Sequence, residues 1–169
     1  MRRNLNFAVI AAVVATVLVA GGAMATAGSG VSATLLARSA FIDNVDLKVT
    51  VQTDGATKVA KVRSGDVVEQ HIIIGPGGNT GWHTHPGPSL VIVTQGTVAV
   101  YDGDDPTCTP HLYTAGTSNN SFLDIGGGDV HMIRDESGAP AQTIAVQLVP
   151  SGSTRRIDRD NPYPGTCPS

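Results

Sequence analysis

The feature that most constrains the fold of this chain is a hydrophobic period of two residues. From Val45 to Gln52, apolar residues at odd positions alternate with polar residues at even positions, which places the apolar side chains on one face of an extended strand. Similar short runs rich in β-branched residues follow at 67–74, 90–94, 97–101, 121–125, 130–134 and 143–149. Glycine and proline clusters separate these runs and supply the turns. The pattern of roughly eight strands predicts an all-β sandwich or barrel.

The first 27 residues have the layout of a secretory signal peptide. Arg2 and Arg3 precede an apolar run over residues 7–20, and the pattern A-x-A ends at Ala25 and again at Ala27. We therefore expect cleavage after one of these alanines and a secreted or extracytoplasmic protein. The sequence leaves an uncleaved anchor open, because residues 7–27 approach the roughly 20 apolar residues that a spanning helix needs.

The rest of the chain is predicted to be one domain. Its 142 residues (169 − 27) can bury one hydrophobic core. We expect a lead-in over 28–44, in which residues 33–40 are the candidate for a short helix, then a β-barrel over 45–150 and an irregular tail over 151–169. Loss of Arg2 and Arg3 changes the formal net charge from −3 to −5, and no basic stripe suits nucleic acid. We expect neither a nucleic-acid partner nor, after cleavage, a membrane.

The two cysteines, Cys108 and Cys167, lie in polar, turn-rich surroundings. Export would place them in an oxidising compartment, where such a pair persists as a disulfide. We therefore expect a bridge that pins the tail to the barrel, and two free thiols are the alternative.

Histidines carry the clearest chemical signal. His83 and His85 are two residues apart, so an extended segment projects both imidazoles to the same side. His131 follows the glycines at 126–128 and begins another β-rich run, so a barrel can bring it opposite the first two. Three neutral imidazoles on one metal ion leave positions open for water or substrate, as in catalytic sites.

Over roughly Val67 to Val149 the sequence resembles the cupin family. The first cupin motif contains a glycine, an H-x-H pair, a glutamate four or five residues on and a later glycine. Gly78 or Gly81, His83, His85 and Gly96 fill these positions. The second motif, P-x-G-x-x-H-x-x-x-N, is matched in spacing by residues 126–131 with Asp135. The resemblance implies a cupin-type β-barrel, a jelly roll or double-stranded β-helix.

The chain departs from the cupin pattern at three positions. The glutamate position falls on Ser89, with Leu90 the next candidate, while the motif proline is Gly126 and the motif asparagine is Asp135. The resemblance therefore implies metal ligation by His83, His85 and His131 without the usual carboxylate. A neutral ligand set leaves the ion its full charge and favours catalysis. It also removes one anchoring ligand, which favours a module that only binds.

The resemblance also implies a cofactor and a kind of partner. The cofactor is one divalent transition metal ion, of Fe, Mn, Zn, Ni or Cu, and the partner is a small organic molecule. The implied activity is that of a small-molecule dioxygenase or a related metal-dependent enzyme. A non-catalytic, extracytoplasmic ligand-binding or sensing protein is the alternative. The sequence identifies no catalytic residue beyond the ligands, and it leaves open whether the chain is a monomer or a homodimer.

Other polar and aromatic residues receive structural interpretations. His71 and His111 are expected to be an ordinary strand residue and a surface residue, and Trp82 a core or rim anchor. Glu69 and Tyr101 are the side chains that a barrel mouth could use as an acid or a proton donor. The acidic loop at 102–105 is interpreted as a solvated turn, because it lacks a twelve-residue calcium loop.

Overall fold

The computed structural model describes residues 27–43, 45–53, 56–63 and 65–169. The predicted signal peptide lies outside these residues except for Ala27. Across the described part of the chain, no helix is long and apolar enough to cross a membrane.

The described residues form strands and connecting turns, and the all-β prediction is confirmed. The strands are β1 (Ser29–Ala40), β2 (Asp46–Thr53), β3 (Ala56–Arg63), β4 (Gly65–Asn79), β5 (His83–Thr84), β6 (Ser89–Gln95), β7 (Thr97–Asp102), β8 (His111–Thr114), β9 (Ser121–Asp124), β10 (His131–Arg134), β11 (Ala141–Pro150) and β12 (Ile157–Asp158).

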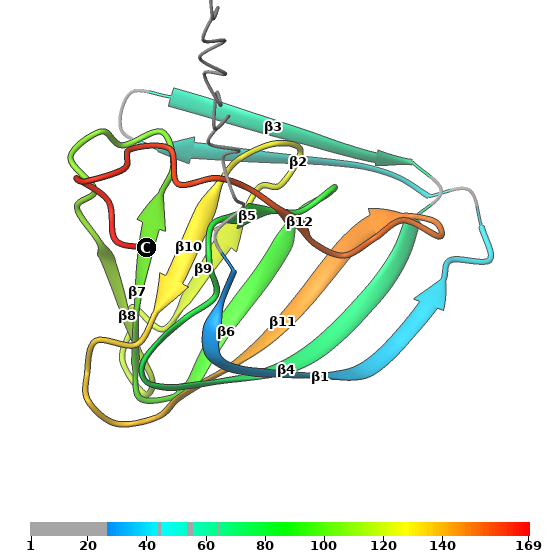
Figure 1. Ribbon diagram of the computed structural model, residues 1–169. Helices are drawn as coiled ribbons and strands as arrows, with labels where there is room; N and C mark the ends of the chain where they lie inside the picture. The colour runs from blue at the N-terminus through cyan, green and yellow to red at the C-terminus, as the bar shows by residue number, and fades with distance from the viewer. Residues whose placement is uncertain (1–26, 44, 54–55, 64) are drawn as a thin grey trace, which may run out of the picture.

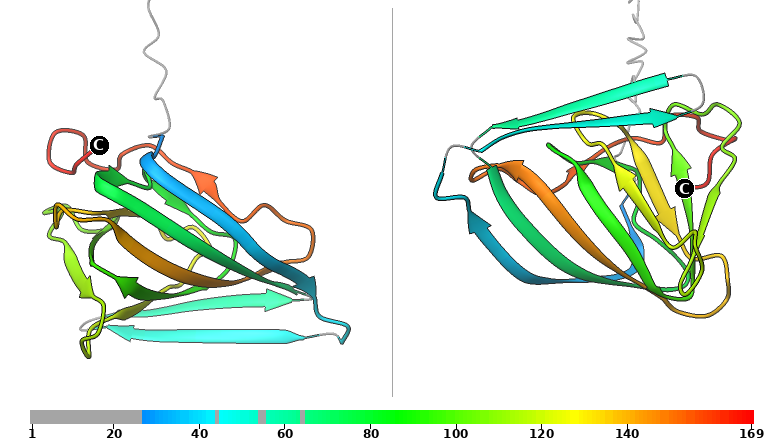
Figure 2. Two further views of the ribbon diagram at one scale, coloured as in Figure 1. Left: turned by 90° about the horizontal axis from the view of Figure 1, so that it is seen from below. Right: turned by 180° about the vertical axis from the view of Figure 1, so that it is seen from behind.

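Ten of these strands form one antiparallel sheet that curls into a nearly closed barrel (Figure 1). Its main path runs β12-β5-β10-β4-β11-β6-β9. Strand β1 pairs with β4 on the edge opposite β11, and β7 pairs with β10 and β8. The two views of Figure 2 show how the long strands β4, β11 and β6 form one curved wall. Such closure leaves few unpaired strand edges.

The period of two places alternate side chains inside this wall. In β11, the odd-numbered residues from Ala141 to Val149 are buried, and the residues between them are half-buried. In β6, Ser89, Val91 and Val93 are buried, whereas Leu90 and Ile92 are exposed. One core cluster is formed by residues of β4, β6, β7, β10 and β11. Its buried members are Ile74, Val93, Val98, Val100, Ile133 and Ala141.

The predicted short helix at residues 33–40 is wrong. These residues lie in β1, which pairs with β4 along its length, from Ser29 opposite Asn79 to Ala40 opposite Asp66. The segment contains the good helix formers alanine, leucine and arginine, but pairing with the edge of β4 overrides this local preference. The predicted lead-in therefore contributes a strand to the main sheet.

Strands β2 and β3 form a separate two-stranded sheet across one end of the barrel (Figure 1). The predicted alternation is confirmed in β2, where Leu47, Val49 and Val51 are half-buried and the even positions from Asp46 to Gln52 are exposed. On β3, Ala60 and Val62 are buried. This hairpin covers the end of the barrel with its apolar face.

Candidate metal centre

The three predicted histidines meet inside the barrel. Strand β5 carries His83, and the next inward-facing position is His85. His131 is the first residue of β10 and lies directly opposite His83 in the β5–β10 register. All three side chains are buried, and one nitrogen from each ring lies within 4.8 Å of the other two. His131 is far from His83 and His85 in sequence, so the barrel topology brings it to the pair.

The glycine turn at 126–128 docks the second motif against the first. Gly127 N donates to His85 O at 2.7 Å, and Gly128 N donates to Thr84 Oγ1 at 3.2 Å. Gly126 has a φ of 64°, and a Cβ there would lie 2.2 Å from the carbonyl oxygen of Gly87. Proline has a Cβ and a fixed negative φ. The change of the motif proline to Gly126 therefore permits this close approach.

The C-terminal segment, residues 151–169, closes another side of the cluster. Its strand β12 pairs with β5, and Asp158 lies opposite His83. The predicted Cys108–Cys167 disulfide is present, with a Cα–Cα distance of 5.3 Å. Trp82 is fully buried and donates from Nε1 to Pro168 O at 2.9 Å. The tail is therefore pinned as predicted, and it also forms part of the site.

Backbone carbonyls orient two of the imidazoles. The Nδ1 atoms of His83 and His85 lie 2.9 Å from Gly81 O and 2.6 Å from Arg155 O. A carbonyl can only accept, so the Nδ1 atom of His83 carries the proton and its Nε2 atom keeps its lone pair. This is the tautomer that metal-binding histidines use when their other ring nitrogen is hydrogen-bonded. The Nδ1 atom of His85 lies near both the Arg155 carbonyl and the amide nitrogen of Gln147. The donor set therefore fits a transition metal ion.

A carboxylate that the sequence analysis missed lies beside the cluster. Asp124, at the end of β9, is buried, and its Oδ2 and Oδ1 atoms lie 3.7 Å from His85 Nε2 and 3.6 Å from His131 Nδ1. Oδ1 accepts from Gly126 N at 3.0 Å. Neither Asp124 Oδ2 nor His131 Nδ1 has a hydrogen-bond partner among the described residues. Two buried polar atoms without partners, one on each residue, indicate that the site is incomplete without a bound group.

Asp124 supplies a carboxylate close to the position of the missing motif glutamate. Ser89 is buried in the same pocket, whereas Leu90 points outward. In the β6–β9 register, Ser89 lies opposite Asp124. The carboxylate absent from position 89 therefore has a counterpart on the neighbouring strand. The sequence signal for it was an acidic residue closing an otherwise apolar strand before the glycine turn.

Burial keeps the imidazoles neutral. It is the largest cause that holds the pKa of His83 well below its usual range, with His131 and Arg156 as further causes. Burial likewise lowers the pKa of His131 to about 4 and lowers that of His85. Burial raises the pKa of Asp124. At neutral pH the three rings are thus available as ligands without first losing a proton.

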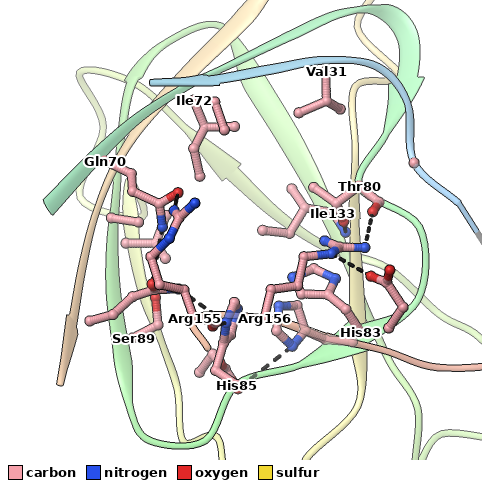
Figure 3. Close-up of a pocket in the computed structure, with 18 of the residues that line it drawn as sticks. Val31, Gln70, Ile72, Thr80, His83, His85, Ser89, Ile133, Arg155 and Arg156 are labelled. Atoms are coloured by element: carbon pink, nitrogen blue, oxygen red, sulfur yellow. Dashed lines mark hydrogen bonds and ion pairs between the residues drawn. The ribbon is translucent and has the colours of Figure 1, made fainter. Parts of the chain in front are cut away.

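The pocket around the cluster has a volume of about 360 Å³. Figure 3 shows the labels Arg155 and Arg156 between His85 and His83, Gln70 at the guanidinium of Arg155, and Val31 and Ile72 at the other end. Gln70 Nε2 donates to Gln147 Oε1 at 3.0 Å, and the Gln147 amide packs 3.0 Å from His85 Nδ1. Neither Arg155 nor Arg156 was predicted to be a site residue, because both lie in the tail that was expected to be irregular.

The remaining candidates lie outside the pocket. Glu69 and His71 lie on the outer face of β4, where His71 Nε2 is hydrogen-bonded to Gln142 at 2.9 Å. Tyr101 donates to Glu136 and does not reach the histidines. His111 is exposed on β8. Asp135 accepts from Ser137 in the turn after β10, which is a structural role.

Comparison with known proteins gives similarity of fold rather than of sequence. No family model matches the chain, and no curated protein matches it in sequence. The structure is similar to the polyketide cyclase RemF from Streptomyces resistomycificus, with 16% identity, 82% of this chain and 80% of that chain covered and a TM-score of 0.49. It is also similar to a cupin-like protein from Thermotoga maritima, with 17% identity, 59% of this chain and 69% of that chain covered and a TM-score of 0.48. An oxalate oxidase in complex with glycolate has 20% identity and a TM-score of 0.41, and the match covers 48% of this chain and 41% of the oxidase.

The barrel and its buried histidine triad agree with the resemblance to cupins seen in the sequence. The strand order and the meeting of the two motif segments confirm the fold predicted from the sequence. The three-histidine cluster is one that could hold a metal ion.

Proposed function

We propose that His83, His85 and His131 hold one divalent transition metal ion, and that the protein uses it to act on a small organic molecule. The carrying observation is the convergence of three buried imidazoles, of which His83 and His85 have Nδ1 bonded to a carbonyl. Such an ion supplies Lewis acidity, activation of bound water or redox chemistry, depending on the metal.

The chain's own residues would support the ion in distinct ways. The carbonyls of Gly81 and Arg155 fix the rings of His83 and His85. Asp124 is placed to accept a proton from His131 Nδ1 and to offset the positive charge of the site. Ser89, Gln70 and Gln147 provide neutral polar groups on the pocket wall, and the apolar strands exclude bulk water.

Elemental analysis of the purified protein tests metal binding. The wild-type protein should carry about one equivalent of a transition metal after metal-replete expression. His85→Ala should abolish this, because it removes one of three ligands. His111→Ala is the matched control, since His111 is exposed and does not belong to the histidine cluster. Equal metal content in all three proteins would show that the ligand assignment is wrong.

We further infer that the protein is exported before it acts. The disulfide between Cys108 and Cys167 and the signal-peptide pattern support this. Mass spectrometry of the protein recovered from outside the cytoplasm should give a new N-terminus after Ala25 or Ala27. Recovery of the full-length chain in the membrane fraction would instead favour an anchor.

Turnover separates the enzyme from the binding alternative. An enzyme should convert a bound small molecule at a rate that falls with His85→Ala and returns with metal reloading of the wild type. Stoichiometric metal and ligand without any turnover, across oxygen-dependent and hydrolytic assays, would assign the protein to ligand binding or sensing.

A further inference from the structure

The pocket has two chemically different ends. The histidines lie at one end, and Val31 and Ile72 lie at the other (Figure 3). In the view of Figure 3, Arg155 and Arg156 lie between the labelled histidines and the Val31 and Ile72 side chains. A ligand that fills this volume therefore meets polar and apolar surroundings at opposite ends. The apolar lining residues are Val31, Ala33, Ile72, Val91, Ile133 and Ala145.

The two arginines differ in how their charge is balanced. Arg156 donates from Nε to Asp158 Oδ1 at 2.6 Å and from Nη2 to Thr80 O at 2.6 Å. Its charge is thus paired with a carboxylate. Arg155 donates from Nη1 to Gln70 Oε1, which is a neutral amide oxygen. Within the part of the chain that the structure describes, no carboxylate forms an ion pair with Arg155.

The Arg155 side chain is held in place by a buried network. Gln70, which accepts its hydrogen bond, is itself buried and donates to Gln147 Oε1, and Gln147 packs against His85. The backbone carbonyl of Arg155 lies 2.6 Å from His85 Nδ1. The guanidinium is therefore fixed against Gln70 on the wall of the pocket that also holds the histidines, with further N–H donors available. Fixed guanidinium donors suit the planar oxygens of a carboxylate.

We propose that the pocket selects a small monocarboxylate with a compact apolar body. Its carboxylate binds Arg155, which lines the same pocket as the histidine cluster, and its body lies against the apolar lining. This assignment rests on the proposed function in placing the carboxylate next to a metal ion, whose positive charge would add to that of Arg155. A neutral ligand of the same shape leaves the charge of the half-buried Arg155 without a carboxylate partner.

Benzoate and benzamide are matched probes of this selectivity, because they share a shape and differ in charge. Isothermal titration of the metal-loaded protein should give benzoate an affinity at least about tenfold above that of benzamide, as a charge-assisted hydrogen bond supplies. Acetate should bind about tenfold more weakly than benzoate, because it has no apolar body. Equal affinity for benzoate and benzamide in the wild-type protein would overturn the proposal.

Arg155→Gln isolates the guanidinium and keeps the backbone carbonyl that His85 uses. Benzoate affinity should fall about tenfold or more, while benzamide affinity and metal content stay unchanged. Arg159→Gln is the control, because Arg159 is an exposed arginine on the same segment. A variant that still prefers benzoate as strongly as the wild type would contradict the proposal.

Metal analysis of the same samples separates this proposal from the proposed function. If the wild-type protein carries no metal, the metal proposal fails, and the benzoate preference of the metal-free protein still decides the role of Arg155. If metal is present and the preference is absent, only the ligand class is wrong. If Arg155→Gln has a lower melting temperature, its loss of affinity could come from a disturbed fold. The ratio of benzoate to benzamide affinity in the wild-type protein then decides the proposal.

Discussion

Strand β11 and the C-terminal segment that follows it both line the pocket, but different forces place them. Strand β11 is hydrogen-bonded on both sides, to β4 along its whole length and to β6 over half of it. The segment 151–169 has only the short β12 in the sheet. It is otherwise held by the disulfide, by Trp82 and by contacts of Ser151 and Gly152 with Asp66.

This difference separates what local pattern determines from what long-range ties determine. The alternation of β11 would place Ala145 and Gln147 inward in any barrel of this kind. The positions of Arg155 and Arg156 instead depend on contacts with residues 70 or more positions away. A change in the segment 151–169 can therefore leave the barrel intact. It should nevertheless alter the charge in the pocket, because the segment carries Arg155 and Arg156.

Removal of the disulfide should have the largest effect on the segment. For Cys108→Ser with Cys167→Ser, we expect the free energy of unfolding to fall by up to about 4 kcal/mol, from the loop of 59 residues. His85 should also lose the ordered carbonyl of Arg155, so the metal should dissociate faster into a chelator. Denaturant unfolding and timed dialysis measure the two effects. Unchanged metal retention would mean that the segment stays in place without its covalent tie.

Substitution of Gly126 tests how closely the glycine turn at 126–128 must approach the segment that carries His83 and His85. Gly126→Ala should lose at least about 2 kcal/mol of stability, because an alanine Cβ is strained at this φ and collides with the Gly87 carbonyl. Gly127→Ala is the control: Gly127 has a φ of 67°, and nothing lies within 4 Å of its added Cβ. It should cost about 1 kcal/mol. Equal losses in denaturant unfolding would show that the close approach is unimportant.

Much of the fold could be predicted from the sequence, and less of the site. Period two and turn residues located β2, β4, β6, β7, β9, β10 and β11, and the motif spacing located the three histidines. β1 was missed because its residues favour a helix locally and become a strand through pairing with β4. Asp124 and Arg155 were missed because neither belongs to a motif. Their role comes from a cross-strand register and from a tail whose course the local sequence does not specify.

Asp124→Asn tests how much a charged neighbour adds to metal binding by the three histidines. We expect metal affinity to fall about tenfold to a hundredfold, because the isosteric amide keeps the volume but loses the negative charge next to His85 and His131. The fold should be retained. Asp160→Asn makes the same chemical change at an exposed position of the C-terminal segment and should leave affinity unchanged. Competition with a chromophoric chelator measures the metal affinity of both variants. Equal affinities would show that Asp124 does not contribute to metal binding.

Asp66→Asn should produce the smallest effect, and one that depends on pH. The Ser151 hydroxyl, Arg38 and the Gly152 N–H hold the pKa of Asp66 below its usual value. A lowered folded pKa stabilises the protein above the unfolded value of about 3.9, and this contribution is lost as the pH falls through the folded pKa. The variant should therefore melt below the wild type at neutral pH, and the gap should narrow in acid below about pH 4. A gap that is constant with pH would show that the Asp66 charge does not hold the segment.

Anomalous diffraction from crystals of the metal-loaded protein would show whether His83, His85 and His131 ligate one metal ion. We expect a single strong anomalous peak in the barrel, about 2.0–2.2 Å from one nitrogen of each of the three rings. A fully metal-loaded crystal with its peak elsewhere, or with none of the three rings turned toward it, would show that these histidines are not the ligands.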